Sequence, residues 1–215
     1  MGNICIYLAG DSTVQTYARG STQAGWGQFI ADFFTEDVKF VNCAIGGRSS
    51  KTFVEEGRLD AILREMKAHD YLFVQMGHND STESKPERYT HPYTKYKQYL
   101  KKYVDGARRL KANPVLITPV ARLHYENGRF MNDFPAYCEA MKQLVSEEGV
   151  PLIDLMTKSL EYYSSVGYDE VFKLFMVSEN GDDFTHFTLK GARRIAKLVS
   201  QGVKELNREL ANFVK

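Results

Sequence analysis

Three residues far apart in the chain have the side chains of a serine hydrolase. Ser12 follows the short apolar run 4–9, and a serine directly after a buried strand is well placed to be an exposed nucleophile. A serine hydroxyl needs a neutral imidazole to take its proton and a carboxylate to orient that imidazole. Asp183 stands three residues before His186, so one loop can deliver both groups. These residue types favour acyl transfer through a serine nucleophile.

Each of these residues also has a plain structural explanation. Ser12 could be the N-cap of the segment that follows it, and His186 could be a surface or N-cap histidine before the last helix. The acid is open at this point, because Asp182 and Glu179 lie close to Asp183 in the sequence. We predict Asp183 because its spacing from His186 suits a turn that brings a carboxylate to Nδ1.

Acyl transfer also requires hydrogen-bond donors for the oxyanion of the tetrahedral intermediate. Gly47 follows the second apolar run and offers a backbone N–H that no side chain obstructs. Asn79 follows the third run and offers its side-chain amide. Each alone is explained as well by a turn glycine or an Asx-turn asparagine. Together with the N–H of Ser12, they place three donors on neighbouring strand ends and favour an oxyanion hole.

Five short apolar runs are typical of buried parallel strands, and they alternate with helical patterns. The runs cover residues 4–9, 38–43, 71–76, 115–118 and 151–153. Helical patterns cover residues 26–34, 59–67, 93–111 and 133–148, and a last one runs from residue 189 onward. This alternation predicts an α/β fold, a five-stranded parallel sheet with helices on both faces. In such sheets the functional residues gather at the carboxyl ends of the strands.

The composition suits one soluble domain over residues 1–215. Hydrophobic residues make up 43% of the chain and charged residues 26%. Lys and Arg number 28 against 27 Asp and Glu, a formal net charge of +1 that argues against a nucleic acid partner. No apolar run approaches the ~20 residues that a membrane-spanning helix needs. We therefore expect neither a nucleic acid nor a membrane partner.

Two observations favour the cytoplasm. The first residues of the chain have neither the basic region nor the apolar core of a secretory signal. The cysteines Cys5, Cys43 and Cys138 are odd in number and lie in apolar surroundings, which predicts buried, reduced thiols instead of a disulfide framework. The prediction is therefore a cytoplasmic protein, the alternative being that this sequence lacks a leader.

Four ordered motifs resemble the SGNH, or GDSL, hydrolase superfamily. They are Gly10-Asp11-Ser12, Gly47 within residues 42–49, Gly77-His78-Asn79-Asp80, and Asp183-Phe184-Thr185-His186. Each motif lies at a predicted strand end or before the last helix. Within the superfamily, the fuller strings are similar to those of the rhamnogalacturonan acetylesterases, bacterial and fungal enzymes that remove acetyl groups from pectin. The strings are Gly10-Asp11-Ser12-Thr13-Val14, Gly25-Trp26-Gly27, Gly47-Arg48-Ser49-Ser50 and Gly77-His78-Asn79-Asp80.

The resemblance implies a flavodoxin-like three-layer sandwich with sheet order 2-1-3-4-5, and a serine esterase that uses no metal or other cofactor. By position, it makes Ser12 the nucleophile, His186 the general base and acid, and Asp183 the residue that orients His186. It also implies an oxyanion hole formed by Ser12, Gly47 and Asn79. The expected partner is an acetylated oligosaccharide substrate, most simply a fragment of rhamnogalacturonan taken up by the cell.

Further residues are candidates for substrate contacts. Arg48 and Arg122 could pair with the carboxylate of a galacturonate unit, although a surface salt bridge explains Arg122 equally well. His78 could bind the sugar or fix its own loop. Trp26 could stack on a sugar ring, but packing of the first helix against the sheet is the simpler prediction. The tyrosine-rich segment 89–103 could line a groove, pack inside or contact a partner.

Two other functions fit parts of the pattern. A lipase-like or thioesterase-like SGNH enzyme needs an apolar trench for a longer acyl chain, whereas the strand-end loops here are rich in Arg, His, Asn and Tyr. A flavodoxin-like binding module without chemistry would hold a nucleotide or a sugar. The sequence contains neither a G-x-G-x-x-G nor a P-loop string, which argues against a nucleotide. The sequence leaves the oligomeric state, the acetylated position and the substrate length open.

Overall fold

The sheet predicted from the apolar runs is present in the computed structural model, which describes residues 4–206 and 209–215. Its strands are β1 (Ile4–Gly10), β3 (Val38–Asn42), β4 (Tyr71–Gln75), β5 (Asn113–Ile117) and β8 (Leu152–Ile153). They lie in the order β3-β1-β4-β5-β8, and every neighbouring pair is parallel. Counted along the chain, this order is 2-1-3-4-5, so the flavodoxin-like sheet is confirmed.

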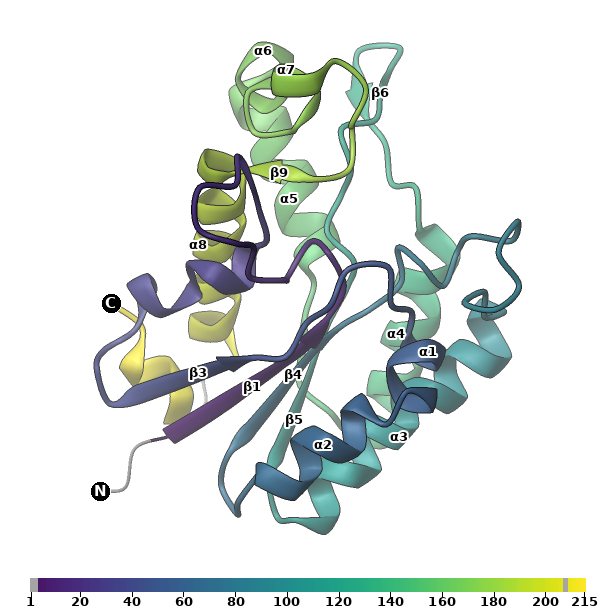
Figure 1. Ribbon diagram of the computed structural model, residues 1–215, viewed down its shortest axis with the longest axis vertical. Helices are drawn as coiled ribbons and strands as arrows, with labels where there is room; N and C mark the ends of the chain where they lie inside the picture. Colours follow the sequence, from purple (N-terminus) through teal and green to yellow (C-terminus); the bar gives the residue numbers. More distant parts are fainter. Residues whose placement is uncertain (1–3, 207–208) are drawn as a thin grey trace.

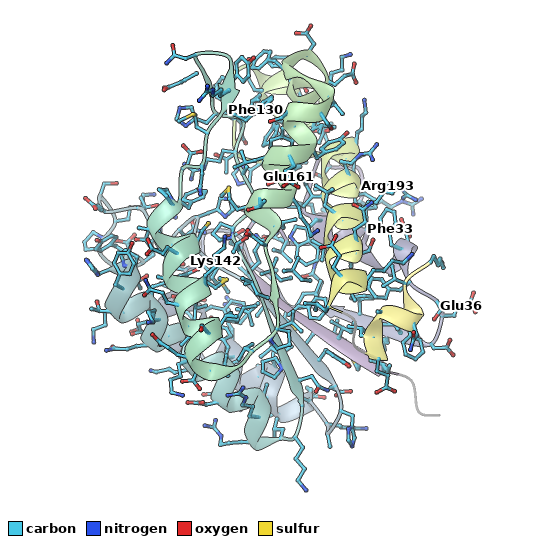
Figure 2. The ribbon with its side chains drawn as sticks, turned by 180° about the vertical axis from the view of Figure 1, so that it is seen from behind. Phe33, Glu36, Phe130, Lys142, Glu161 and Arg193 are labelled. Carbon is cyan, nitrogen blue, oxygen red and sulfur yellow. The ribbon has the colours of Figure 1, made fainter. Side chains whose placement is uncertain are left out.

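Helices cover both faces of this sheet (Figure 1). One layer holds α1 (Ser50–Glu55), α2 (Arg58–Glu65), α3 (Lys97–Arg109) and α4 (Pro135–Glu148). The other holds α5 (Leu155–Val166), α8 (Leu189–Glu205) and the short 3₁₀ helices η1 (Trp26–Gln28) and η2 (Ile30–Phe33). Figure 2 shows α5 and α8 side by side from behind, with Glu161 on α5 and Arg193 on α8. The predicted three-layer sandwich is confirmed.

Burial on both faces explains why the strands appear in the sequence as continuous apolar runs. Adjacent residues of β1, such as Leu8 and Ala9, point to opposite faces of the sheet, yet both are fully buried. Leu116 and Ile117 in β5 are buried in the same way. Each strand of the sheet centre therefore contributes to two cores, one under each helical layer.

Short elements complete the fold at the carboxyl edge of the sheet. The helices there are α6 (Tyr168–Phe172) and α7 (Val177–Asn180). Two antiparallel ribbons pair β2 (Gln23–Ala24) with β9 (Phe187–Thr188), and β6 (Tyr125–Glu126) with β7 (Arg129–Phe130). The first ribbon joins the loop after β1 to the segment directly before α8. It therefore brings two motifs that are far apart in the sequence to the same end of the sheet.

The segment 26–34, predicted as one helix, forms η1 and η2 instead. The N–H of Trp26 donates to the carbonyl oxygen of Thr13 at 2.8 Å. The N–H of Gly27 donates to the carbonyl oxygen of Val14 at 3.1 Å. Within the segment, the N–H of Phe29 donates to the carbonyl oxygen of Trp26, three residues earlier, at 3.0 Å, which is the 3₁₀ pattern. The prediction was wrong because glycines, which are poor helix formers, stand at the start of the segment, and these fit closely against the loop after β1.

The other predicted helices are present with shifted ends. The pattern 93–111 begins as a π-helical turn, η3 (Pro92–Tyr96), and continues as α3. The last helix, α8, ends at Glu205, and residues 209–213 form the separate 3₁₀ helix η4 (Glu209–Phe213). Helices α1, α5, α6 and α7 were not predicted. Within the described residues, no helix has both the length and the apolar character needed to cross a membrane.

The tyrosine-rich segment 89–103 packs inside the protein through two of its rings, whereas Tyr93 is 42% exposed. Tyr96 and Tyr103 are fully buried. Their hydroxyl groups donate to the backbone carbonyl oxygens of Met76 at 2.8 Å and Ser50 at 3.0 Å. These hydroxyls tie α3 and η3 to the ends of β4 and the start of α1, so the two rings support the loops at the carboxyl edge.

Trp26 and the cysteine Cys138 are buried inside the protein. The Trp26 ring is fully buried, which fits packing against the sheet and leaves no face for a sugar. Cys138 is buried as predicted, whereas Cys5 and Cys43 are only half-buried, because β1 and β3 lie at one side of the sheet. All three thiols are free, and burial raises the pKa of Cys138 to about 12.

The close contact at Gly27 gives a first prediction. A β-carbon at this position would lie 2.5 Å from both the Val14 carbonyl oxygen and the Asn42 side-chain nitrogen. We expect Gly27→Ala to lower the free energy of unfolding by about 1–3 kcal/mol, the usual cost of overpacking. Denaturant titration measures this change. The control is Gly149→Asn, where φ is +60° and no atom lies within 4 Å of the added β-carbon. An unchanged Gly27→Ala protein would contradict the packing described here.

Candidate active site

The loop after β1 holds Ser12 through hydrogen bonds to its neighbours. Asp11 is fully buried, and its Oδ1 accepts the backbone N–H of Thr13 at 2.9 Å and the Thr13 hydroxyl at 2.8 Å. This Asx turn fixes the backbone on both sides of Ser12. Asp11 thus supports the turn that follows it. The half-buried Ser12 side chain lines a pocket, whose other residues are described below.

A chain of buried side chains links this loop to the middle of the sheet. Gln75, at the end of β4, donates from Nε2 to the Thr13 hydroxyl at 2.7 Å. Its Oε1 accepts the indole N–H of Trp26 at 2.8 Å. Gln75 therefore joins β4, the nucleophile loop and η1, and buried polar networks of this kind hold one arrangement when every member is paired.

Two residues that sequence reasoning missed support Ser12 from the other side. Tyr17 donates from its hydroxyl to the carbonyl oxygen of Ser12 at 3.0 Å. Gln23, in β2, donates to the same hydroxyl at 2.7 Å. Burial raises the pKa of Tyr17 to about 12, so the phenol keeps the proton that it donates. No motif marks Tyr17, but Gln23 stands two residues before the Gly25-Trp26-Gly27 string.

The structure brings the three candidate catalytic residues into one hydrogen-bonded chain. His186 Nε2 lies 2.8 Å from Ser12 Oγ, although 174 positions separate the two residues. His186 Nδ1 lies 2.8 Å from Asp183 Oδ2. Asp183 is thus the acid in contact with the imidazole, and the alternatives Asp182 and Glu179 are not.

Asp183 orients His186 with both of its carboxylate oxygens. Oδ1 accepts the backbone N–H groups of Thr185 at 3.0 Å and His186 at 2.9 Å, which leaves Oδ2 for the ring. Burial is the largest single influence on this carboxyl group and raises its pKa. The hydrogen bonds from His186 and Thr185 outweigh burial, so the net pKa of Asp183 is lowered. An ionised Asp183 holds the proton on Nδ1 and leaves Nε2 free to act as the base.

The ribbon of β2 and β9 fixes the position of this catalytic loop. Phe187, the residue after His186, pairs with Ala24 in β2. The carbonyl oxygen of His186 accepts the N–H of Met176 at 2.8 Å, and that of Asp183 accepts the N–H of Val177 at 2.8 Å. The loop is therefore held to the segment after β1 on one side and to α7 on the other.

The predicted oxyanion donors surround the same pocket, which has a volume of about 670 Å³. Ser12, Gly47 and Asn79 all line it. Gly47 has a φ of +79°, a conformation that favours glycine, and the Asn79 amide donates to the carbonyl oxygen of Arg48 at 3.0 Å. Within the described residues, the backbone N–H groups of Ser12 and Gly47 have no acceptor. Such unpaired donors beside a nucleophile suit a developing negative charge.

The three predicted substrate contacts have different positions. Arg122 lines the pocket and is half-buried. His78 also lines it, but its ring is 4% exposed and Nε2 lies 3.0 Å from the Val120 carbonyl oxygen, which fixes the loop. Arg48 does not line the pocket. It pairs with Glu56 at 3.1 Å, a carboxylate that Arg58 also contacts, and donates to the Gly46 carbonyl oxygen at 2.9 Å, so these contacts hold its side chain outside the pocket.

Arg88 is a pocket residue that sequence reasoning missed. Its Nη1 would lie 4.0 Å from a β-carbon added at Gly47, which places the guanidinium beside the oxyanion donors. Among the described residues, no carboxylate lies within 4.0 Å of a nitrogen of Arg88 or Arg122. Nothing in the local sequence distinguishes Arg88, because it lies in a long loop outside the motifs. The pocket therefore presents two guanidinium groups without ion-pair partners.

A comparison with protein families now identifies the chain. Residues 6–199 match the family model described as GDSL-like lipase/acylhydrolase. The chain belongs to the GDSL-like lipase/acylhydrolase family. The match spans all five strands of the sheet from Ile6 of β1 onward, and it includes Ser12, Asp183 and His186. Members of this family are hydrolases of carboxylic esters, so the protein is a carboxylic ester hydrolase.

Two curated relatives and one solved structure are similar to this chain over nearly its whole length. A Bacillus subtilis protein named "Probable rhamnogalacturonan acetylesterase YesY" is 61% identical over 97% of this chain and 96% of its own length. Rhamnogalacturonan acetylesterase RhgT of the same species is 42% identical, over 98% of this chain and 94% of its own. The crystal structure of YxiM from Bacillus subtilis has a TM-score of 0.88 at 29% identity, covering 97% of this chain and 58% of that one.

The contact between Asp183 and His186 gives a second prediction. In Asp183→Asn an NH₂ group replaces one of the two carboxylate oxygens, and the side chain becomes neutral. The imidazole therefore loses the negative charge that holds its proton on Nδ1. We expect kcat for p-nitrophenyl acetate to fall by about ten-thousandfold, the usual effect of this change in a Ser-His-Asp triad. Asp182→Asn is the matched control, because Asp182 lines the same pocket but does not contact the ring. If Asp182→Asn lost the activity instead, the orienting role of Asp183 would be refuted.

Proposed function

We propose that this GDSL-family protein is a serine esterase that removes O-acetyl groups from carbohydrate, with acetylated rhamnogalacturonan oligosaccharides as the substrate. The observation that carries the proposal is the chain of contacts from Ser12 through His186 to Asp183, with 2.8 Å at each step. The names of two relatives support the substrate, since both are rhamnogalacturonan acetylesterases by name and align over nearly the whole chain.

The proposed reaction has two halves. Ser12 Oγ attacks the acetyl carbonyl carbon while His186 Nε2 takes the hydroxyl proton, and the carbonyl oxygen becomes an oxyanion. The N–H groups of Ser12 and Gly47 and the Asn79 amide stabilise that charge. The intermediate collapses, the bond to the sugar oxygen breaks, and His186 gives its proton to the leaving hydroxyl. Water then attacks the acetyl-serine with His186 again as base, which releases acetate and restores Ser12.

The charges of the pocket support an anionic sugar. Arg88 and Arg122 line the pocket without carboxylate partners from the described residues, so either can pair with the carboxylate of a galacturonate unit beside the acetylated position. An Arg pair of this kind gives an acetylesterase a preference for uronate-containing chains. Because two local arginines are enough to pair with one carboxylate, this substrate is compatible with the formal net charge of +1 of the whole protein.

Two broader interpretations of the sequence remain predictions. One is that residues 1–215 form a single domain, which fits the packing of both helical layers on one sheet within the described residues. The other is action in the cytoplasm on imported fragments, which the free thiols of Cys5, Cys43 and Cys138 favour.

The third prediction tests the chemistry itself. We expect Ser12→Ala to lower kcat for p-nitrophenyl acetate at least about a thousandfold, because the nucleophile is removed while the fold is retained. A fluorophosphonate probe should label the wild-type protein and Ser146→Ala, whose serine is exposed on α4 and far from the motifs in the sequence, but not Ser12→Ala. Retention of hydrolysis in Ser12→Ala would refute the serine esterase mechanism.

The fourth prediction concerns the substrate. We expect acetate release from acetylated rhamnogalacturonan oligosaccharides to have a higher kcat/KM than release from acetylated xylan. Arg88→Gln and Arg122→Gln should each lower that preference by about tenfold, because a charged hydrogen bond to the uronate is lost. Equal rates on the two polysaccharides would instead indicate a general carbohydrate acetylesterase. A preference for p-nitrophenyl octanoate over acetate would favour the lipase-like alternative.

A further inference from the structure

A second pocket opens directly beside the active-site pocket. Its volume is about 380 Å³, and Arg122, Phe184 and Thr185 line both pockets. The second pocket extends from these shared residues to the β6–β7 ribbon and α6, which lie next to each other at the end of the molecule above the sheet (Figure 1). A chain bound at Ser12 can therefore continue into this second pocket without leaving the protein surface.

Exposed aromatic rings gather in this pocket. Tyr125 is 42% exposed, Tyr168 37% and Phe184 44%, which places them among the most exposed large apolar side chains of the described residues. The rings of Tyr125 and Tyr168 lie 5.1 Å apart between centroids at an angle of 44°. Exposed aromatic rings that gather at one site mark a binding surface more often than singly scattered ones do. These three residues are called the aromatic subsite below.

The aromatic subsite is held rigidly by the elements beneath it. Asn127 and Gly128 join β6 to β7 with φ angles of +50° and +78°, as expected for a two-residue type I′ turn. Tyr125 packs on Phe130 at 4.8 Å, and Phe130 packs on the buried ring of Tyr163 at 5.5 Å. Figure 2 shows Phe130 between the ribbon and α5. The exposed ring of Tyr125 is therefore preorganised, which lowers the entropic cost of binding.

Charged groups surround these rings and argue against a lipid chain. His124 lies 2.6 Å from Asp133 and 3.0 Å from Glu126, and all three line the second pocket with Arg122. An acyl chain in this pocket would take these groups away from water without giving them partners. A sugar ring suits them, because its C–H faces can lie on aromatic rings while its hydroxyl groups pair with polar side chains.

We propose that the aromatic subsite binds the sugar unit next to the acetylated one, so that the enzyme recognises an oligosaccharide and not a single sugar. This inference rests on the proposed carbohydrate acetylesterase activity, and it adds that the length of the substrate is read by Tyr125 and Tyr168. The Tyr125–Tyr168 pair is continuous with the active site through Phe184, which lies in the catalytic loop. The N–H of Leu123 donates to the Phe184 carbonyl oxygen at 2.9 Å, so the segment that leads to β6 is joined to that loop.

The experiment compares substrates of two lengths. For the wild-type protein, kcat/KM for an acetylated rhamnogalacturonan hexasaccharide should exceed that for acetylated galacturonate alone, which has no neighbouring sugar to place in the aromatic subsite. Tyr125→Ala should lower the ratio of these two values about tenfold, because the ring surface is lost. Tyr125→Phe should restore the ratio. Tyr93→Ala is the matched control, because Tyr93 is also 42% exposed and lines neither pocket.

A binding measurement separates this inference from the proposed activity. The deacetylated hexasaccharide is titrated calorimetrically into Ser12→Ala and into the double variant Ser12→Ala/Tyr125→Ala. We expect the Kd of the double variant to be about tenfold higher than that of Ser12→Ala. This result would support the aromatic subsite even if acetate release failed. Equal Kd values, or a length preference that Tyr125→Ala leaves unchanged, would overturn the inference while the hydrolysis of p-nitrophenyl acetate still tested the esterase. A Tyr125-dependent preference for octanoyl esters would also overturn it and assign the pocket to an acyl chain.

Discussion

The hydrogen bond between Ser12 Oγ and His186 Nε2 sets the requirement that the rest of the structure meets. Its length of 2.8 Å has to be maintained between two loops whose residues Ser12 and His186 are 174 positions apart in the sequence. Neither loop is part of the sheet, so each has to be fixed by its own contacts. The β2–β9 ribbon joins them directly, since it pairs the residue after His186 with the segment that follows the nucleophile loop. A few hydrogen bonds thus connect the two ends of the sequence at the reacting atoms.

Close backbone contact is what allows these loops to meet. A β-carbon at Gly25 would lie 2.4 Å from the Gln15 carbonyl oxygen, and one at Gly191 would lie 2.0 Å from the Leu174 carbonyl oxygen. Gly25 precedes η1, which is thereby seated on the loop that carries Ser12. Gly191 lies in the first turn of α8, which is seated on the segment between α6 and α7. Larger residues at either position would push these segments apart. The shape of the site therefore depends on glycines that take no part in the chemistry.

The electrostatics of the pocket follow from the same arrangement. Backbone N–H groups lower the pKa of Asp183 despite its burial, which supplies a charge to the imidazole without a lysine or arginine partner. The two arginines of the pocket do not pair with Asp183, and the proposed function assigns them to a substrate carboxylate. The pocket thus combines a carboxylate beside the imidazole with two arginine side chains. An overall net charge of +1 is compatible with this local separation.

The sequence by itself determined the fold class, because buried parallel strands are continuous apolar runs. The strand order followed from the resemblance of four motifs to the SGNH hydrolases, and the structure confirms it. The rule that residues at the carboxyl ends of parallel strands share one edge of the sheet indicated Ser12, Gly47 and Asn79 as candidates, and their catalytic roles stay predictions. Local periodicity could not reveal the 3₁₀ turns at residues 26–34, since these turns go with the close fit of Gly25 and Gly27 against the loop after β1.

Only the tertiary structure decided which arginines reach the pocket and which residues support Ser12. Arg48 stands in a motif but pairs with Glu56, whereas Arg88 stands outside every motif and lines the pocket. Tyr17 and the Tyr125–Tyr168 pair are likewise defined by partners that the local pattern does not specify. The physical reason is that a strand end fixes where a backbone emerges, whereas the direction of a long side chain is fixed by packing between elements that are distant in the sequence.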